Sequence, residues 1–223
     1  MSFADKKPIL AIETSGELCS AAVYFDQYKF AEVNLRLKHV HSEKIIDIID
    51  EVLKQVQLQF SDLSSIAISS GPGSFTGLRI GMSAVKGLAL GSGLPLIAVP
   101  TFEALAYQIC TYLPVGTEFF IANKVNLEEV YNAKFRKVLD GYEFIDKLSV
   151  TWNEEFENRL NDKSLLFGNF IPGNTAVSTC SVAWPSASSV ARWAYKFGKD
   201  SLTYDYDFLE PFYLKNFVIK EHK

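Results

Sequence analysis

The sequence predicts an α/β protein of two related lobes, each with a mixed five-stranded-type sheet and flanking helices. Short apolar runs typical of strands alternate with helical patterns in the first half. A length of 223 residues suffices for one large domain or two lobes with a sizeable core. Hydrophobic residues make up 48% of the chain and charged residues 22%, which is the composition of a globular protein.

The first half opens with three expected strands. Residues 9–13 (ILAIE) form a continuous apolar run, and residues 19–25 and 29–37 follow it with strand-like composition. The turn at 26–28 (DQY) separates the last two runs. Because the connections are so short, we expect these strands to form an antiparallel meander.

Helices and apolar strands then alternate. Apolar residues recur at helical spacing over 42–56, where Ser42 is the expected N-cap. A short buried strand is expected at 64–71, a helix at 76–90 and a further strand at 95–99. The order β-β-β-α-β-α-β is that of a ribonuclease-H-like half, the building block of the actin-like ATPase (ASKHA) fold.

The second half is expected to be a degenerate copy of the first. We place an N-terminal ribonuclease-H-like lobe with the dimerisation face at 1–105 and a C-terminal lobe at 106–223. Asp140-Gly141 is a hairpin signal between two of its strands. The expected elements are a connecting helix at 101–113, strands at 119–125, 128–138, 141–150 and 164–169, a helix at 186–200 and an irregular tail at 207–220.

Composition narrows the classes of function. The net charge is −4 and no basic tail or patch is visible, so we expect contact with tRNA only through a partner. No apolar run approaches the roughly 20 residues that span a bilayer, and the start lacks a signal-peptide pattern. Three scattered cysteines without a CxxC pair are typical of a reducing compartment, so we expect a cytoplasmic protein without membrane contact.

The stretch GPGSFTGLRIG, residues 71–81, resembles a phosphate loop but fails both common patterns. It lacks the GK[ST] ending of a P-loop, and Thr76 stands where a dinucleotide fingerprint needs its third glycine. Ser74 or Thr76 is expected to cap the following helix, whose first N–H groups could hold an anion. Gly73, Ser74 and Arg79 are the candidate contacts, and a capped turn without a ligand is the alternative.

The helix after this loop carries several glycines, and interior glycine costs about 1 kcal/mol relative to alanine. Gly77, Gly81, Ala84, Leu88 and Gly91 are spaced so that they share one face. Such a face lets another backbone approach closely. The sequence leaves two interpretations open, namely tight packing inside the lobe and a protein interface formed together with the helix at 42–56.

Four segments resemble those of a known family. They are ILAIETSGELCSAAVY, HSEKI, SSIAISSGPGSFTGLRIGMSAVKGLAL and VPTFEALA. Together they closely resemble the TsaB (YeaZ) family over about the first 105 residues, and the GPGSFTGLRIG string is specific to it. The second half fits more loosely, because Ala122-Asn123-Lys124 stands in place of an Asp-Ala-Arg-like segment and Lys215 replaces an arginine in a closing Pro-x-Tyr-x-Arg motif.

The resemblance implies the ASKHA fold and a part in making threonylcarbamoyladenosine in tRNAs that read ANN codons. It implies a catalytically inactive partner of TsaD, the transferase that acts on the adenosine next to the anticodon, with the ATPase TsaE joining both. Alone, the chain is expected to form a homodimer. It is expected to have no cofactor of its own, and ATP or ADP at the junction with TsaD is an open alternative. The expected interface residues are His41, Glu43, Ile46, Ile49, Leu53, Gly77, Gly81, Val85 and Leu88.

The resemblance also bears on the chemistry of the chain. Members of the TsaD family hold a metal with an HxxxH motif, whereas residues 99–105 of this chain (VPTFEAL) contain no histidine. We therefore expect no metal site and no catalytic residues. Glu13, Thr14 and Ser15 stand where ASKHA kinases place a phosphate hairpin, which makes them candidate nucleotide contacts. The alternative function is an ASKHA phosphotransferase or a glycoprotease-like hydrolase acting on its own.

Overall fold

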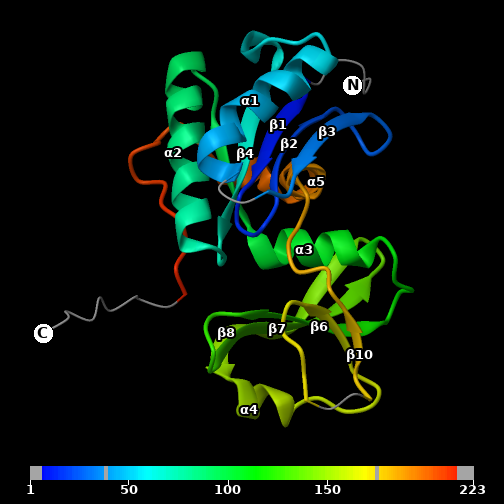
Figure 1. The fold of residues 1–223 in the computed structure, drawn as a ribbon. Helices are drawn as coiled ribbons and strands as arrows, with labels where there is room; N and C mark the ends of the chain where they lie inside the picture. The colour runs from blue at the N-terminus through cyan, green and yellow to red at the C-terminus, as the bar shows by residue number, and fades with distance from the viewer. Residues whose placement is uncertain (1–6, 38–39, 174–175, 215–223) are drawn as a thin grey trace, which may run out of the picture.

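The computed structural model describes residues 7–37, 40–173 and 176–214. They form two mixed sheets joined by helix α3 (Thr101–Cys110), which lies between the sheets (Figure 1). This arrangement confirms the predicted α/β class with two sheets and flanking helices. The predicted lobe division at residue 105 falls inside α3, and it stays a prediction.

The first sheet has the order β11-β5-β4-β1-β2-β3. Strand β1 pairs antiparallel with β2 and parallel with β4, so the predicted opening meander is confirmed. Strands β4 and β5 also run parallel. The strands span Ile9–Glu13 (β1), Cys19–Tyr24 (β2), Phe30–Leu35 (β3), Ser65–Gly71 (β4), Leu96–Pro100 (β5) and Leu202–Thr203 (β11).

Helices cover both faces of this sheet. Helices α1 (Val40–Gln55) and α2 (Phe75–Ser92) pack on the face that carries Leu10 and Ile12. Helix α5 (Ala187–Phe197) packs on the opposite face, together with part of α3. Because neither face of β1 meets water, its sequence is apolar without alternation, as in a strand buried on both sides.

The second sheet has the order β10-β9-β6-β7-β8. Phe119 on β6 faces α3, and its neighbour Phe120 faces the short helix α4 on the other side. Gly141 has a φ of 140°, which explains the predicted hairpin turn at that position. The elements are β6 (Glu118–Lys124), β7 (Glu129–Val138), β8 (Gly141–Trp152), α4 (Asn153–Glu157), β9 (Leu165–Gly168) and β10 (Ser178–Cys180).

Two details of the helices near the glycine loop bear on the predictions. Ser74 is the N-cap of α2, because its side chain accepts a hydrogen bond from the Gly77 N–H, and this confirms one of the two predicted caps. The predicted cap of α1 is wrong. That helix begins at Val40, so Ser42 lies inside its first turn.

The glycines of α2 point in two directions. A Cβ on Gly77 would lie 2.1 Å from the Thr14 carbonyl oxygen, and one on Gly81 would lie 2.1 Å from Thr14 Oγ1. A Cβ on Gly87 or Gly91 would meet no atom within 4 Å. The first pair therefore permits close packing on the turn after β1, whereas the second pair lies open at the surface of the described structure.

This division predicts opposite effects of the same substitution. Gly87→Ala should stabilise the protein by about 0.5–1 kcal/mol, because alanine is the better helix former and the space is open. Gly81→Ala should destabilise it by about 1–3 kcal/mol, because the methyl group overlaps Thr14. Urea unfolding of both variants measures the two changes. Equal effects of the same sign would contradict the packing described for α2.

Candidate functional site

Two turns meet at one end of the first sheet. The turn after β1 contains Ser15, whose carbonyl oxygen accepts a hydrogen bond of 2.7 Å from the Ser74 N–H. A Cβ on Gly73 would lie 2.4 Å from that same oxygen, so this approach requires glycine. The two predicted anion-binding segments therefore bind each other, and one N–H group that we expected to be free is already used.

Glu13 lies beneath these turns and is fully buried. Its carboxylate accepts hydrogen bonds from the backbone N–H and hydroxyl of Ser15 and from the hydroxyl of Ser69. Burial raises the pKa of Glu13 from 4.5 to about 7, although the serine hydrogen bonds act in the opposite direction. A carboxyl group held in this way is a structural element of the turn, and its contact with a nucleotide stays a prediction.

A cleft of about 390 Å³ opens above the turns, between the two sheets. Gly73 and Ser74 line it from the first lobe, and the indole of Trp184 packs directly against Gly16. A Cβ on Gly16 would lie 2.2 Å from that ring. Of the six predicted anion contacts, Gly73 and Ser74 thus reach the cleft, and their contact with a nucleotide stays a prediction. Glu13, Thr14 and Ser15 are buried below, and Arg79 does not line the cleft.

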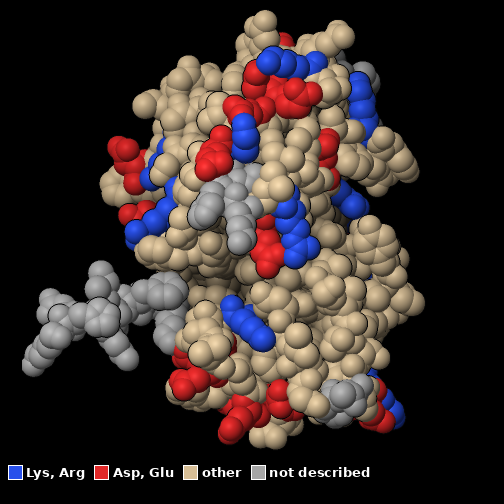
Figure 2. Space-filling model, viewed as in Figure 1, with Lys and Arg blue, Asp and Glu red and all other residues tan. Residues whose placement is uncertain are grey.

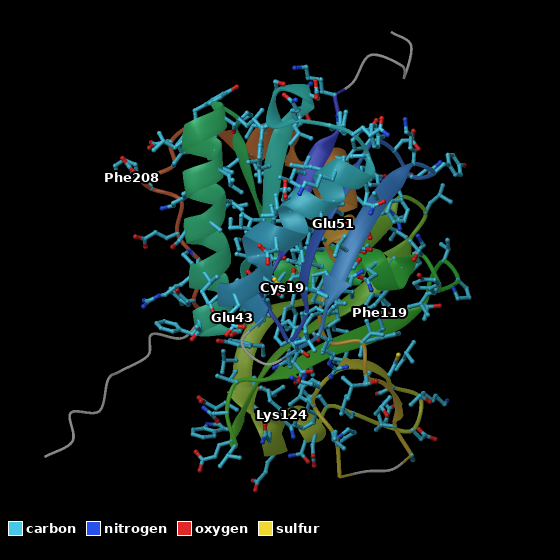
Figure 3. All side chains as sticks on the ribbon, turned by 45° about the horizontal axis from the view of Figure 1, so that its top comes forward. Cys19, Glu43, Glu51, Phe119, Lys124 and Phe208 are labelled. Carbon is cyan, nitrogen blue, oxygen red and sulfur yellow. The ribbon has the colours of Figure 1, made fainter. Side chains whose placement is uncertain are left out.

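The unusual Asn123-Lys124 segment forms part of the opposite wall. The Asn123 amide donates to the Ala183 carbonyl oxygen at 2.6 Å and accepts from the Asn169 N–H at 3.1 Å. Lys124 is exposed in the second lobe and lines the cleft (Figure 3). Asn123 therefore joins three stretches of chain, and Lys124 places a cation at the opening.

Arg79 lies away from the cleft and contacts Phe75 and Tyr213. Its guanidinium lies over the Phe75 ring, 3.8 Å from the centroid, and its Nε donates to the Tyr213 hydroxyl at 3.0 Å. The backbone of Phe212 donates to the Ser70 carbonyl oxygen at 2.6 Å. The segment that resembles the family's closing motif thus runs back along α2. Lys215 lies outside the described residues.

The predicted interface residues divide by burial. Glu43 and Ile46 are exposed on α1, with Ile46 at 52% and Glu43 labelled in Figure 3. His41 and Leu88 are half-buried, and His41 Nε2 lies 3.0 Å from the Leu18 carbonyl oxygen. The others are buried in the described structure and offer little side-chain surface to a partner, and their assignment as contacts stays a prediction: Ile49, Leu53, Gly77, Gly81 and Val85.

Two exposed residues on α2, Gly87 and Leu90, were missed by the sequence interpretation. Leu90 is 75% exposed, and Gly91, which the glycine spacing did include, is also exposed. We group the exposed residues Glu43, Ile46, Gly87, Leu90 and Gly91 under the name partner face. The two helices that carry them, α1 and α2, cover the same side of the first sheet (Figure 1). The spacing of Gly87 and Leu90 from Gly81 was the available signal, because it places them on another side of the helix. Spacing alone could not show which side of the helix faces the core.

The described residues contain no group of three or more His, Cys, Asp or Glu side chains placed to hold a metal ion. His39 and His222 lie outside these residues. Cys19 and Cys110 are buried free thiols, and burial raises the pKa of Cys19 to about 12. Among the helices of the described part of the chain, none has the length and apolar character needed to cross a membrane.

Comparison with solved structures shows which known fold this chain adopts. Two Pseudomonas aeruginosa structures, YeaZ and a protein described by its similarity to peptidase YeaZ, match with TM-scores of 0.77 and 0.78. Each is 21% identical, and the matches cover 93–94% of this chain and all of the other. The fold is therefore that of a two-lobed ASKHA-like protein of the YeaZ type.

Sequence relatives point in the same direction. The tRNA threonylcarbamoyladenosine biosynthesis protein TsaB of Escherichia coli is 35% identical over 133 residues, which cover 60% of this chain and 57% of that protein. TsaB of Bacillus subtilis is 37% identical over 98 residues, which cover 44% of this chain and 43% of that protein. The model of the family TsaD, tRNA N6-adenosine threonylcarbamoyltransferase, matches residues 36–118. The matches confirm the resemblance to the TsaB (YeaZ) family, and they span about half the length of these curated relatives.

The buried carboxyl predicts a pH dependence of stability. Between pH 4.5 and about 7 the folded chain keeps the Glu13 proton and the unfolded chain loses it, so stability falls as the pH rises. The loss from pH 5 to pH 8 should be about 2 kcal/mol, and Glu13→Gln should remove it. Urea unfolding of both proteins at the two pH values measures this. The same pH dependence in the variant would show that Glu13 does not retain its proton in the fold.

Proposed function

We propose that this chain is the non-catalytic partner of a TsaD-type transferase in the threonylcarbamoyladenosine modification of tRNA. The observation that carries the proposal is the similarity to relatives named as TsaB biosynthesis proteins. The segment matched by the transferase family model, 36–118, contains both α1 and α2. The helices that carry the partner face thus lie within the segment that matches the transferase family.

The chemistry of the partner face suits helix packing. The open positions at Gly87 and Gly91 let the backbone of another helix approach α2 closely. The exposed side chains of Ile46 and Leu90 supply apolar surface that association would bury. The same features would serve a second copy of the chain, so we expect a homodimer when the transferase is absent.

The interior of the first lobe supports a non-catalytic role. The one acidic side chain of the hairpin turn 13–16, Glu13, is bound to serines and buried under a closed pair of turns. The expected transferase histidines are replaced in the sequence VPTFEAL at 99–105. These features disfavour a phosphotransferase or hydrolase acting alone. Within the proposal, any ATP or ADP lies at the junction with the transferase, where a TsaE-type ATPase also joins.

The surface charge supports indirect contact with tRNA. The net charge is −4, and Figure 2 shows acidic and basic side chains interspersed on the face that it draws. Strong independent binding of tRNA would need a continuous basic surface to neutralise phosphates. We therefore propose that the transferase supplies the main tRNA contacts and that the assembly acts in the cytoplasm.

Gly87→Leu tests the partner face. The new side chain should block the close approach to α2 and abolish a 1:1 complex with the TsaD-type transferase from the same cell, measured by size exclusion with light scattering. The expected loss is at least about 100-fold in affinity, because overpacking costs about 1–3 kcal/mol and contacts around it are also lost. The fold should persist, since Gly87 faces open space.

The matched control is Glu155→Leu, which adds the same side chain to an exposed position on α4 in the second lobe. It should leave the complex unchanged. A Gly87→Leu protein that is folded and binds the transferase as tightly as the wild type would exclude this face. Failure of the wild-type chain to bind at micromolar concentrations would contradict the proposed function itself.

A further inference from the structure

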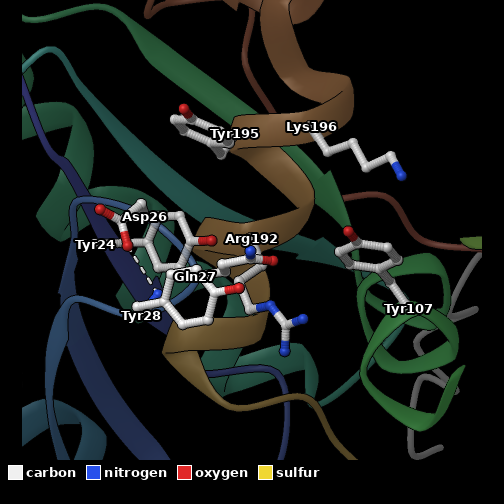
Figure 4. Close-up of a pocket in the computed structure, with 8 residues that line it drawn as sticks. All are labelled: Tyr24, Asp26, Gln27, Tyr28, Tyr107, Arg192, Tyr195 and Lys196. Atoms are coloured by element: carbon white, nitrogen blue, oxygen red, sulfur yellow. Dashed lines mark hydrogen bonds between the residues drawn. The ribbon is translucent and has the colours of Figure 1, made fainter. Parts of the chain in front are cut away.

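A second concave site lies on the opposite side of the first sheet from the partner face. Its volume is about 630 Å³, within the range of small-molecule pockets. The β2–β3 turn at 24–28 forms one wall, α3 contributes Tyr107, and α5 contributes Arg192 and Lys196 (Figure 4). The first sheet separates this pocket from α1 and α2, so binding here need not affect the partner face.

The pocket is rich in tyrosine. Tyr24 and Tyr195 meet edge to face at 5.7 Å, and Tyr28 is 87% exposed at the tip of the turn. The phenol groups of Tyr24, Tyr28 and Tyr107 form no hydrogen bond with any described residue. Tyr24 is only 4% exposed, whereas the Tyr28 ring offers an open apolar face with a polar edge, which is the kind of surface on which a planar heterocycle stacks.

Arg192 stands at the centre of this arrangement. It is half-buried, and Figure 4 shows it between the tyrosines of the turn and Tyr107. Its guanidinium lies 5.6 Å from the Tyr107 ring centroid, and it has no ion pair or hydrogen bond with another residue in the described part of the chain. Arg192 thus carries a guanidinium that has no acceptor among the described residues, and an anionic ligand would supply one.

The other charged groups of the pocket are already engaged. Lys196 Nζ donates to the Asp140 carbonyl oxygen and lies 3.8 Å from the carboxylate of that residue. Asp26 accepts hydrogen bonds from the backbone N–H groups of Tyr28 and Lys29 at 2.8 and 3.0 Å. The carboxylate of Asp26 thus stabilises its own turn, and Arg192 is the cation left to receive a ligand.

We propose that this pocket binds a nucleoside monophosphate unit, with its phosphate on Arg192 and its base against Tyr28 of the β2–β3 turn. Arginine matches phosphate with two parallel hydrogen bonds, and the exposed Tyr28 ring offers a stacking face. The site is independent of the proposed function, because it uses neither the partner face nor the cleft between the lobes.

Such a unit has two sources, namely a free nucleotide and a nucleotide within single-stranded RNA. A single phosphate needs little positive charge, whereas a strand needs a basic path along its backbone. The net charge of −4 therefore favours the free nucleotide.

Calorimetric titration of the purified chain with AMP, adenosine and a hexa-adenylate RNA tests the proposal. AMP should bind, and adenosine should bind at least about tenfold more weakly, because it lacks the phosphate. Arg192→Gln should weaken AMP binding by about tenfold or more through loss of a charge-assisted hydrogen bond. Tyr28→Ala should also weaken it, and this exposed side chain can be removed without disturbing the core.

Lys147→Gln is the control for net charge, since it removes one exposed cation from β8 in the second lobe. It should leave the AMP affinity unchanged. Binding of hexa-adenylate alone, lost in Arg192→Gln, supports the site with RNA as the source. The proposal is overturned by no binding of either ligand at millimolar concentration, or by equal affinity of the wild type and the folded Arg192→Gln and Tyr28→Ala variants.

Discussion

The contact between the turn after β1 and the start of α2 is the interaction on which the rest of the structure depends. Gly77 and Gly81 allow the helix backbone to lie against Thr14, and the Ser74 N–H completes the contact at Ser15. Side chains at those glycines would push α2 away from the sheet. The contact thereby fixes which side of α2 turns outward and presents Gly87 and Gly91 to the surface.

The same contact explains why this end of the sheet holds a closed pair of turns. Glu13 is enclosed beneath it with Ser15 and Ser69, and the chain near Phe212 returns to cover the end of β4. A carboxyl group in such a place lowers stability at neutral pH, because burial favours its neutral form. The ordered turn therefore has a cost in free energy, which the packing of α2 offsets.

Much of the architecture could be predicted because its signals are local. Apolar runs located the strands, and Ser74 together with the glycine loop located the start of α2. The prediction that Ser42 is the N-cap was wrong because serine, although common at N-caps, can also lie inside the first turn of a helix, as it does in α1. Strand β11 has two residues and pairs with β5 from about 100 residues away, so no local pattern could reveal it.

The sites were harder to predict than the fold. Glycine spacing identified a face of α2, but spacing cannot tell close packing inside a lobe from an open surface position. Gly81 packs on Thr14 and Gly87 faces open space, although both lie on the same helix. The tyrosine pocket is formed by a turn and two helices that are distant from it in the sequence. Each helix contributes a residue, Tyr107 or Arg192, that does not stand out from the amphipathic pattern around it. Such a combination exists only after the chain has folded.

The two proposed sites thus lie on opposite faces of the first sheet, the partner face on the side of α1 and α2 and the polar aromatic pocket on the side of α3 and α5. Each site uses residues that the core does not need, such as Leu90 and Tyr28. Under the two proposals, one small chain would contact a protein and a small ligand without competition between them.

The most direct test of the central claim is a reconstituted tRNA threonylcarbamoylation assay in which each protein is omitted in turn. The account predicts that modification requires both the TsaD-type transferase and this chain, and that this chain alone gives none. Modification by this chain without the transferase, or undiminished modification by the transferase without this chain, would contradict its role as a required non-catalytic partner.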